Sequence, residues 1–302
     1  MKNNFKKLID TLQDSIFTWD YFSDFEKVKK NISKIENELN LLNGLIGKEN
    51  IEEKFLELIE EYPKVRKVLP ILIAVRKNKI SEMQIISDVK EWNPELKKYL
   101  FYDELTKESK KELMVFFRES GLKDIFQSKE IKSVVDYVFG VEVGMDTNGR
   151  KNRTGKLMED IVEKFINDFC QKNKDFEYIE QGTKKKIFEK WNYEIEIDKN
   201  NRKFDFVIFN KKKNKIFIFE VNYYSSGGTK LKSVAGEFQE LNELLKRQEI
   251  NFYWITDGKG WLTSKNSLEE TFIKMNSNIY NIQDLKNGIL EKILKQNDKQ
   301  KS

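Results

Sequence analysis

The chain up to about residue 135 carries an apolar periodicity that predicts helices. Apolar residues recur every three or four positions from Ile32 to Ile46, which places them on one face of a helix, and Gly47 follows as its terminator. The same spacing predicts further helices around residues 55–59 and 113–117. The apolar stretch 65–75 contains Pro70, so we expect it to be kinked or broken there.

Beyond that point the pattern changes to short apolar runs between polar turns, which is typical of strands. A helix is expected after Thr154 and continues to about Cys170. It is followed by segments expected as strands at 193–197, 204–209 and 216–222, a helix at 231–247 and a strand at 252–256. This order predicts an α/β (α+β) fold with a mixed central sheet flanked by helices. We therefore expect a mainly helical N-terminal region over residues 1–135 and an α/β domain over residues 136–302.

The composition removes several kinds of chemistry. The 302 residues include no histidine and one cysteine, Cys170, which excludes Ser-His-Asp and Cys-His catalysis and most zinc sites. Carboxylates, lysines and a hard metal ion bound by oxygen remain. The net charge of +5 permits nucleic-acid binding without arguing for it. No apolar run approaches the ~20 residues of a membrane span and no signal peptide is evident, so we expect a cytoplasmic protein.

Two carboxylates interrupt the most apolar strands of the chain. Asp205 lies in the strand 204–209 and Glu220 in the strand 216–222, and the polar tract between these strands predicts a hairpin turn. The hairpin brings Asp205 alongside Glu220, and the period of two places Glu220 and Asn222 on one face. Carboxylates this close repel each other unless they share a cation, and Mg²⁺ is a natural choice. The alternative is a pair of exposed acids at strand ends, each paired with a lysine.

The segment that follows these strands is polar and rich in small residues. Residues 222–230 include two glycines together with Ser225, Ser226 and Lys230. A purely structural connection rarely needs such a composition, whereas a loop beside a ligand does. We therefore take Ser225 and Ser226 as candidate DNA contacts.

A third candidate carboxylate, Glu159, lies in the helix expected after Thr154. At about 100° per residue the apolar side chains of this helix form one arc, with Glu159 at its edge and Asp160 pointing to solvent. A helix packed on the sheet would hold Glu159 at the rim of the core, within reach of a metal ion. A solvated position on the flank of the helix fits the same pattern.

Basic residues gather just before this helix. Arg150, Lys151, Asn152 and Arg153 stand together with glycine on either side. Arginine suits the edge of guanine and asparagine that of adenine, and the N–H groups of a helix start suit a phosphate. We expect a DNA-contacting loop, with an ordinary basic surface loop as the alternative.

Several long strings resemble one family of proteins. They are Val134–Asp146 with Arg153–Gly155, Arg202–Val207, Glu220–Tyr224 and Trp254–Trp261. They are similar to the DpnII/MboI family of type II restriction endonucleases, and the likeness covers most of the chain. The resemblance implies a PD-(D/E)XK-like catalytic and DNA-binding domain over residues 136–302. It also implies cleavage of double-stranded DNA at unmethylated GATC, 5′ of the guanine, with four-base 5′ overhangs, and a cognate adenine methyltransferase as genetic partner.

Position by position, the resemblance implies that Asp205 and Glu220 are metal carboxylates and that Glu159 is the acid on the helix. In one departure, Asn222 stands where the general pattern has lysine, and an amide supplies neither positive charge nor a base. Asn222 would then orient the attacking water, or Lys230 would supply the charge. In either case we expect water to attack with the help of Mg²⁺.

A palindromic site is most simply matched by a two-fold homodimer in which each subunit cuts one strand. Two alternatives stay open, a related structure-specific or repair nuclease and a DNA-binding module whose carboxylates are inactive. Cleavage of plasmid DNA in Mg²⁺ separates the binding module from both enzymes. A discrete fragment pattern separates restriction from repair.

Overall fold

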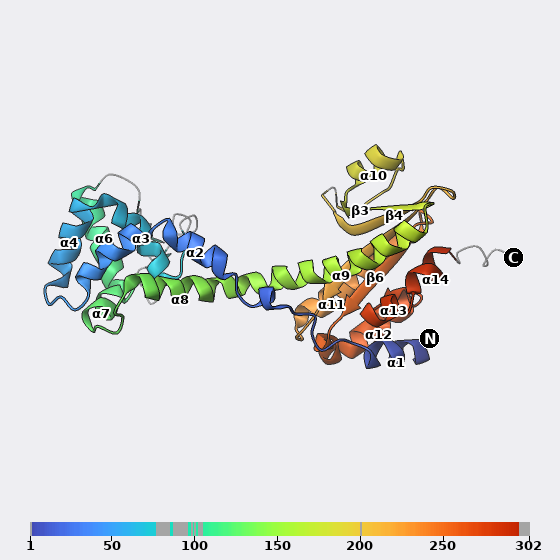
Figure 1. Ribbon diagram of the computed structural model, residues 1–302, viewed down its shortest axis with the longest axis horizontal. Coiled ribbons are helices and arrows are strands. Elements are labelled where there is room, and N and C mark those ends of the chain that lie inside the picture. The colour runs from blue at the N-terminus through green and yellow to red at the C-terminus, as the bar shows by residue number, and fades with distance from the viewer. Residues whose placement is uncertain are drawn as a thin grey trace. The chain divides into compact units, whose positions relative to one another are not determined.

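The computed structural model describes residues 2–76, 85–86, 96–97, 99, 101, 105–199 and 201–295 (Figure 1). The chain forms two compact units, which we call the sheet unit (Met1–Thr18 with Lys151–Ser302) and the helical unit (Trp19–Arg150). The domain boundary expected near residue 135 falls in the first turn of helix α8 (Val134–Asp146), which belongs to the helical unit.

The sheet unit is built on one mixed sheet of five strands in the order β3-β4-β5-β6-β7 (Figure 1). The strands are β3 (Phe176–Gly182), β4 (Phe204–Asn210), β5 (Lys215–Tyr223), β6 (Asn251–Asp257) and β7 (Ile279–Tyr280). The pairs β3-β4 and β4-β5 are antiparallel, whereas β5-β6 and β6-β7 are parallel. The mixed central sheet expected from the sequence is therefore confirmed.

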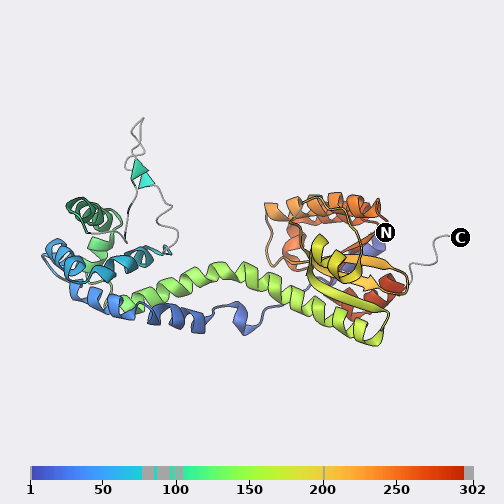
Figure 2. The same ribbon diagram turned by 90° about the horizontal axis from the view of Figure 1, so that it is seen from above.

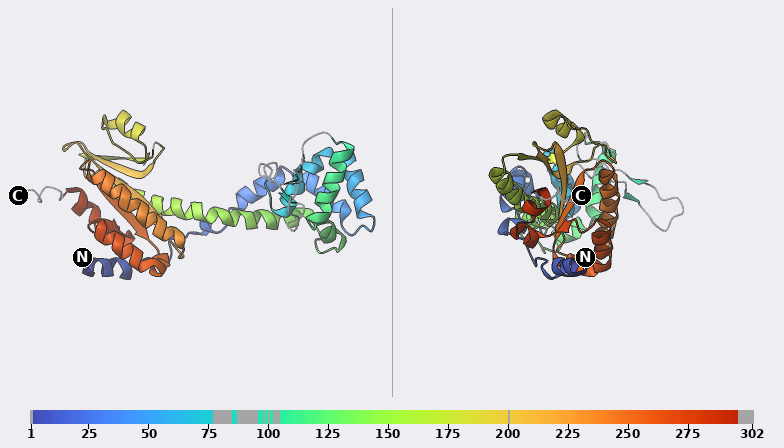
Figure 3. Two further views of the ribbon diagram at one scale, coloured as in Figure 1. Left: turned by 180° about the vertical axis from the view of Figure 1, so that it is seen from behind. Right: turned by 90° about the vertical axis from the view of Figure 1, so that its right-hand side faces the viewer.

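Helices cover both faces of this sheet (Figure 3). One face packs on α1 (Lys2–Asp10), α10 (Lys184–Trp191), α11 (Thr229–Lys246), η5 (Lys259–Ser264) and α12 (Lys265–Lys274). The other face packs on α9 (Arg150–Lys172), α13 (Ile282–Lys286) and α14 (Ile289–Lys295). Alternation along β5 sends Ile216 and Ile218 to the first core and Phe217 and Phe219 to the second.

The helical unit packs short helices around a separate apolar core (Figure 2). Its α-helices are α2 (Phe25–Ser33), α3 (Glu36–Leu42), α4 (Ile51–Glu61), α6 (Lys107–Glu119), α7 (Leu122–Gln127) and α8. Its other described elements are η1 (Trp19–Tyr21), η2 (Asn43–Leu45), η3 (Pro63–Ile73), η4 (Thr147–Gly149), β1 (Ile85–Ile86) and β2 (Leu96–Lys97). Buried acids tie α8 to α2, because Glu142 accepts a hydrogen bond from Asn31 and Asp146 binds Lys27 at 2.9 Å.

The first strand of the sheet is not the expected one. Residues 193–197 form an irregular segment in which Ile195 is buried in the core, so their alternation reflects packing and not strand pairing. The strand that pairs with β4 on that side is β3. Its sequence, Phe-Glu-Tyr-Ile-Glu-Gln-Gly, mixes charged with apolar residues because most of the strand is only partly buried, and this weakened its pattern.

The helices differ from expectation at three places. The single helix expected from Ile32 to Ile46 is two, α2 and α3, because Ile35 leaves the helical region with φ −133°. The stretch around Pro70 is continuous 3₁₀ helix, η3, and is not broken. Helix α9 begins at Arg150 and not after Thr154, so the basic segment expected as a loop is helical. Arginine and lysine favour helix, and Gly155, which follows this segment within α9, does not outweigh them.

None of the described helices combines the length and the apolar character needed to cross a membrane.

Candidate active site

The hairpin expected from the sequence is present and sets two carboxylates side by side. Strands β4 and β5 pair with Phe206 opposite Phe219, so the next residues along, Asp205 and Glu220, are neighbours where the pairing ends. There Asp205 accepts a hydrogen bond at its Oδ2 from the backbone N–H of Val221 at 2.7 Å. This bond fixes Asp205 against β5 and beside Glu220.

Glu220 is the more deeply buried of the two acids. Its side chain is 9% exposed, and among the described residues its Oε1 has no hydrogen-bond donor. Burial raises the pKa of Glu220 well above its ordinary value, and the adjacent charge of Asp205 raises it further. Burial also raises the pKa of Asp205, against the opposing effect of the Val221 hydrogen bond. Burial is the first cause of both shifts, whereas the neighbouring carboxylate raises only the pKa of Glu220.

Glu159 approaches this pair through Gln181, a residue that no sequence pattern had indicated. The Gln181 Nε2 lies 3.4 Å from Oε2 of Glu159 and 3.5 Å from Oδ1 of Asp205. Glu159 comes from α9, on the face of the sheet opposite α11. Burial raises the pKa of Glu159, and the charge of Asp205 adds to the shift. As expected, Glu159 is half-buried and Asp160 exposed.

The backbone of β3 shapes the position of Gln181. This residue has φ +48°, and it interrupts the pairing of β3 with β4 between Glu180 and Gly182. Gly182 is required here, because a Cβ atom would lie 2.5 Å from the Val207 side chain. A Gln-Gly pair at the end of a half-buried strand was the signal that could have located this bend.

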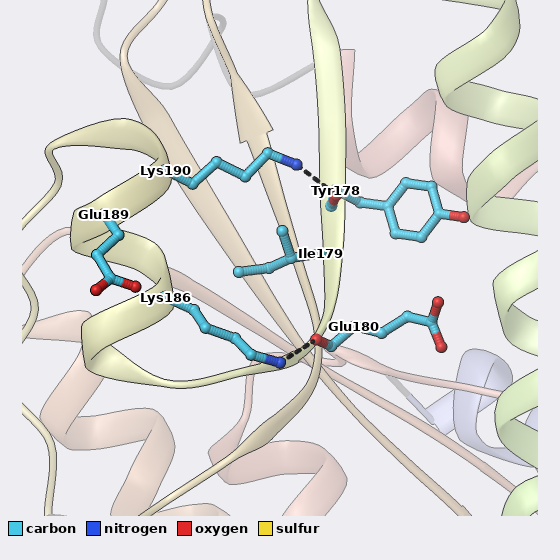
Figure 4. A pocket seen from close by; sticks show the side chains of 6 residues that line it. All are labelled: Tyr178, Ile179, Glu180, Lys186, Glu189 and Lys190. Atoms are coloured by element: carbon cyan, nitrogen blue, oxygen red, sulfur yellow. Dashed lines mark hydrogen bonds between the residues drawn. The ribbon is translucent and has the colours of Figure 1, made fainter.

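Helix α10 lies beside strand β3, and two of its lysines hydrogen-bond to the backbone of that strand (Figure 4). The Lys190 ammonium donates to the carbonyl of Tyr178 at 3.3 Å, and that of Lys186 donates to the carbonyl of Gln181 at 3.1 Å. These two lysines line an open pocket between β3 and α10, and neither Asp205 nor Glu220 is among its lining residues. Both lysines donate hydrogen bonds to backbone carbonyls of an edge strand, and this structural role explains their positions.

The carboxylate pair fits a divalent cation. Mg²⁺ is usually held by one or two carboxylates, with water and substrate phosphate completing its shell. Asp205 and Glu220 supply that number, and a buried oxygen without a hydrogen-bond donor suits a cation. Among the described residues, no group of three or more acids or cysteines lies close enough to hold a metal ion together. The role of Glu159 as a third ligand therefore stays a prediction.

The general pattern has a lysine at the position of Asn222, and Asn222 and Lys230 are the two candidates to take over its role. Their surroundings differ. Asn222 shares the face of Glu220 on β5, and its Oδ1 accepts a hydrogen bond from the indole of Trp254 at 2.9 Å. Lys230 is exposed in the first turn of α11. Within the described part of the chain, no hydrogen bond or ion pair links Lys230 to Asp205 or Glu220.

The loop after β5 lies against a second loop with almost no space between them. Gly258 has φ +99°, and a Cβ atom there would lie 2.3 Å from the Tyr224 carbonyl. The Gly260 N–H donates to that same carbonyl at 2.8 Å. This contact explains both glycines of the Trp254–Trp261 string. Ser225 and Ser226 are exposed on the first loop.

Asp257 is the buried anchor of this region. Its carboxylate accepts backbone hydrogen bonds from Gln13 and Gly258 at 2.7 Å and from Ile282 at 3.0 Å. Three segments far apart in the sequence thus meet at one side chain. Burial raises the pKa of Asp257, and the three N–H groups oppose the shift. Its surroundings assign it a structural role.

The basic residues before Glu159 occupy the start of α9. The Arg150 Nε donates to the carbonyl of Phe22 at 3.1 Å, and its guanidinium lies 5.9 Å from the ring centre of Tyr21. Asn152 is exposed and Arg153 is half-buried. Lys151 follows Arg150 in the same turn. These contacts hold Arg150 within the helical unit.

Comparison with known proteins identifies the family. The sequence matches the DpnII restriction endonuclease family over residues 4–292. It is 50% identical to the type II restriction enzyme MjaIII of Methanocaldococcus jannaschii, over 97% of this chain and 100% of that protein. It is 40% identical to the type II restriction enzyme DpnII of Streptococcus pneumoniae, over 96% of this chain and 98% of that protein. For MboI of Moraxella bovis the identity is 38%, with 97% of each chain covered. The chain therefore belongs to the DpnII restriction endonuclease family, and it is a type II restriction endonuclease, a site-specific deoxyribonuclease.

Proposed function

We propose that this endonuclease hydrolyses double-stranded DNA at unmethylated GATC, 5′ of the guanine, leaving four-base 5′ overhangs, and that its metal ion is Mg²⁺. The observation that carries the proposed chemistry is the pairing of Asp205 with Glu220 where β4 and β5 part. The choice of GATC rests on the strings that resemble the family. We further propose that the enzyme works in the cytoplasm beside an adenine methyltransferase that protects the host.

Each residue of the site has a proposed task. Asp205 and Glu220 bind the cation, and Glu159 joins them from α9. When bound, Mg²⁺ would lower the pKa of a water molecule and stabilise charge on the scissile phosphate. Asn222 orients the attacking water, or Lys230 supplies positive charge to the phosphate.

DNA contacts are proposed at two places. The first turn of α9 offers Arg150, Lys151, Asn152 and Arg153. The loop after β5 offers Ser225 and Ser226, which are exposed close to the carboxylate-bearing strand. Arginine and asparagine are suited to base edges, whereas hydroxyl groups are suited to phosphate oxygens.

A plasmid with mapped GATC sites tests the proposal. With Mg²⁺ we expect discrete fragments whose sequenced ends carry 5′-GATC overhangs, and we expect none with a chelator. The matched control is the same plasmid methylated on the adenine of every GATC, which should stay intact. Cleavage without a discrete pattern would favour the repair nuclease, and specific binding without cleavage would favour the inactive module.

A further inference from the structure

A buried arginine side chain lies beside Glu220. Arg202 lies two residues before β4, its side chain is 8% exposed, and its Nη1 is 3.8 Å from Oε1 of Glu220. This distance is an electrostatic contact and is too long for a hydrogen bond. The Oε1 that it approaches is the buried oxygen for which the described residues supply no donor.

Two acids fix the guanidinium in place. Asp198 accepts from Nε at 2.5 Å and from Nη2 at 2.6 Å, which is the bidentate geometry of a strong arginine–carboxylate pair. Glu237 of α11 accepts from Nη2 at 2.7 Å and also binds Lys199 at 2.9 Å. Burial alone would lower the pKa of Arg202, but these bonds outweigh it and the pKa is raised. Arg202 is therefore a permanent charge with little freedom to move.

The site needs such a charge. Position 222 carries an asparagine, whose Oδ1 is engaged by Trp254, and Lys230 is exposed on α11. Without a cation nearby, the buried Oε1 of Glu220 would have no partner among the described residues to hold the side chain in place. A metal ion would then have to reorient that side chain before it could bind.

We propose that Arg202 is a positioning residue for the metal site: anchored by Asp198 and Glu237, it holds Glu220 in place and provides the fixed positive charge that position 222 lacks. This inference rests on the proposed function, in which Asp205 and Glu220 hold Mg²⁺. Arg202 acts through Glu220 and needs no contact with DNA or with the reacting atoms.

Three variants separate positioning from a purely structural role. Arg202→Met removes the charge and keeps the apolar stem, whereas Arg202→Lys keeps a charge without the fork. Lys199→Met is the matched control, because it removes the other cation on Glu237 and leaves Glu220 untouched. Two readouts are taken against Mg²⁺ concentration, the thermal midpoint of the DNA-free protein and the single-turnover rate of cleavage.

Arg202→Met is expected to raise the half-saturating Mg²⁺ concentration about tenfold in both readouts, the scale of losing a group that orients a metal ligand. Arg202→Lys should return it to within about threefold of wild type, and Lys199→Met should match wild type. An unchanged or lower half-saturating concentration in Arg202→Met overturns the inference, because removing a positive charge would then only have eased cation binding.

Asp198→Asn decides the question if Arg202→Met does not fold. Asp198 is partly exposed, so this variant loosens the fork without leaving a buried charge unpaired. We expect a rise in half-saturating Mg²⁺ of roughly threefold, and no rise overturns the inference. If wild type is neither stabilised by Mg²⁺ nor able to cut, the proposed function fails and the inference falls with it. If wild type does both and the variants behave like it, the inference alone fails.

Discussion

Among single residues, Asp205 carries the sharpest functional expectation. Asp205→Asn keeps an oxygen that accepts the Val221 N–H but removes the charge that would hold the cation. We expect cleavage in Mg²⁺ to fall on the order of a thousandfold, equivalent to about 4 kcal/mol of transition-state stabilisation. Specific DNA binding should persist or tighten, because a negative charge near phosphate is gone.

The measurement is single-turnover cleavage of a GATC duplex, with affinity measured separately in a chelator. Asp160→Asn is the matched control, since Asp160 is an exposed acid of α9 whose side chain pairs with Lys156. Wild-type cleavage by Asp205→Asn would remove Asp205 from the metal site.

A second residue-level prediction concerns the stability of the metal-free protein. The pKa of Glu220 is raised in the folded state, so its stabilising contribution is complete below the pKa of an unfolded glutamate and is lost as pH rises through the folded value. Glu220→Gln should therefore match wild type near pH 4 and be more stable at pH 8. A gain of about 1 kcal/mol corresponds to roughly 2–4 °C in thermal midpoint.

Thermal melts at both pH values check this expectation, with Glu243→Gln, an exposed position on α11, as control. Added Mg²⁺ should stabilise wild type and leave Glu220→Gln nearly unchanged. A variant that is less stable than wild type at pH 8 would show that the ion pair with Arg202 outweighs burial.

Candidate site residues could be predicted from the sequence where an acidic residue interrupts the apolar pattern of a strand. Asp205 and Glu220 stood out because they break apolar strands joined by a polar turn. Gln181 and Arg202 did not, since their importance comes from contacts across the sheet. Gln181 reaches Glu159 and Asp205 at sequence separations of 22 and 24, and Arg202 reaches Glu237 at a separation of 35. No local pattern encodes such pairings.

Among the elements, α9 links the proposed recognition residues to Glu159 along one helix. Arg150, Asn152 and Arg153 stand in its first turn, and Glu159 follows two turns later. We expect at least one of the three to read a base. Its alanine variant should then lose about 1–3 kcal/mol on GATC and much less on a duplex with one changed base pair.

Affinities of the three alanine variants on both duplexes across a salt series give the answer. A residue that binds phosphate weakens both duplexes equally and lowers the slope of affinity against salt. If all three variants behave in that way, the start of α9 is a phosphate clamp. Base reading would then fall to the loop that holds Ser225 and Ser226.

Elements were predictable in proportion to the strength of their apolar pattern. Strands β4, β5 and β6 and helix α11 contribute many residues to the cores of the sheet unit, and the bounds predicted for them lie within two residues of the observed ones. Strand β3 was missed because charged residues interrupt it and its outer edge is covered by lysines of α10. The start of α9 was misplaced because Gly155 and Asn152 resemble a loop in composition while the helix continues through them.

On the scale of the whole molecule, the prediction concerns assembly on DNA. A palindromic target with one cut in each strand calls for two copies related by two-fold symmetry. We expect a complex of two 36.0 kDa chains on one GATC duplex. The mass of the complex in Ca²⁺ or in a chelator checks this stoichiometry.

A mixing experiment tests whether each subunit cuts one strand. Wild type mixed with excess Asp205→Asn should convert supercoiled plasmid to nicked circles, since most active pairs would contain one intact site. Linear product without accumulated nicked circles would indicate that one chain cuts both strands.

The meeting of Gln13, Gly258 and Ile282 at Asp257 has a consequence for the order in which the protein becomes active. During synthesis the helical unit, a single continuous stretch, can fold while later residues are still being added. The sheet unit cannot fold in this way, because Gln13 in its first segment hydrogen-bonds to Asp257, which is translated much later. We therefore expect nuclease activity to appear only when synthesis has passed residue 282, and we expect a shorter nascent chain to leave DNA uncut.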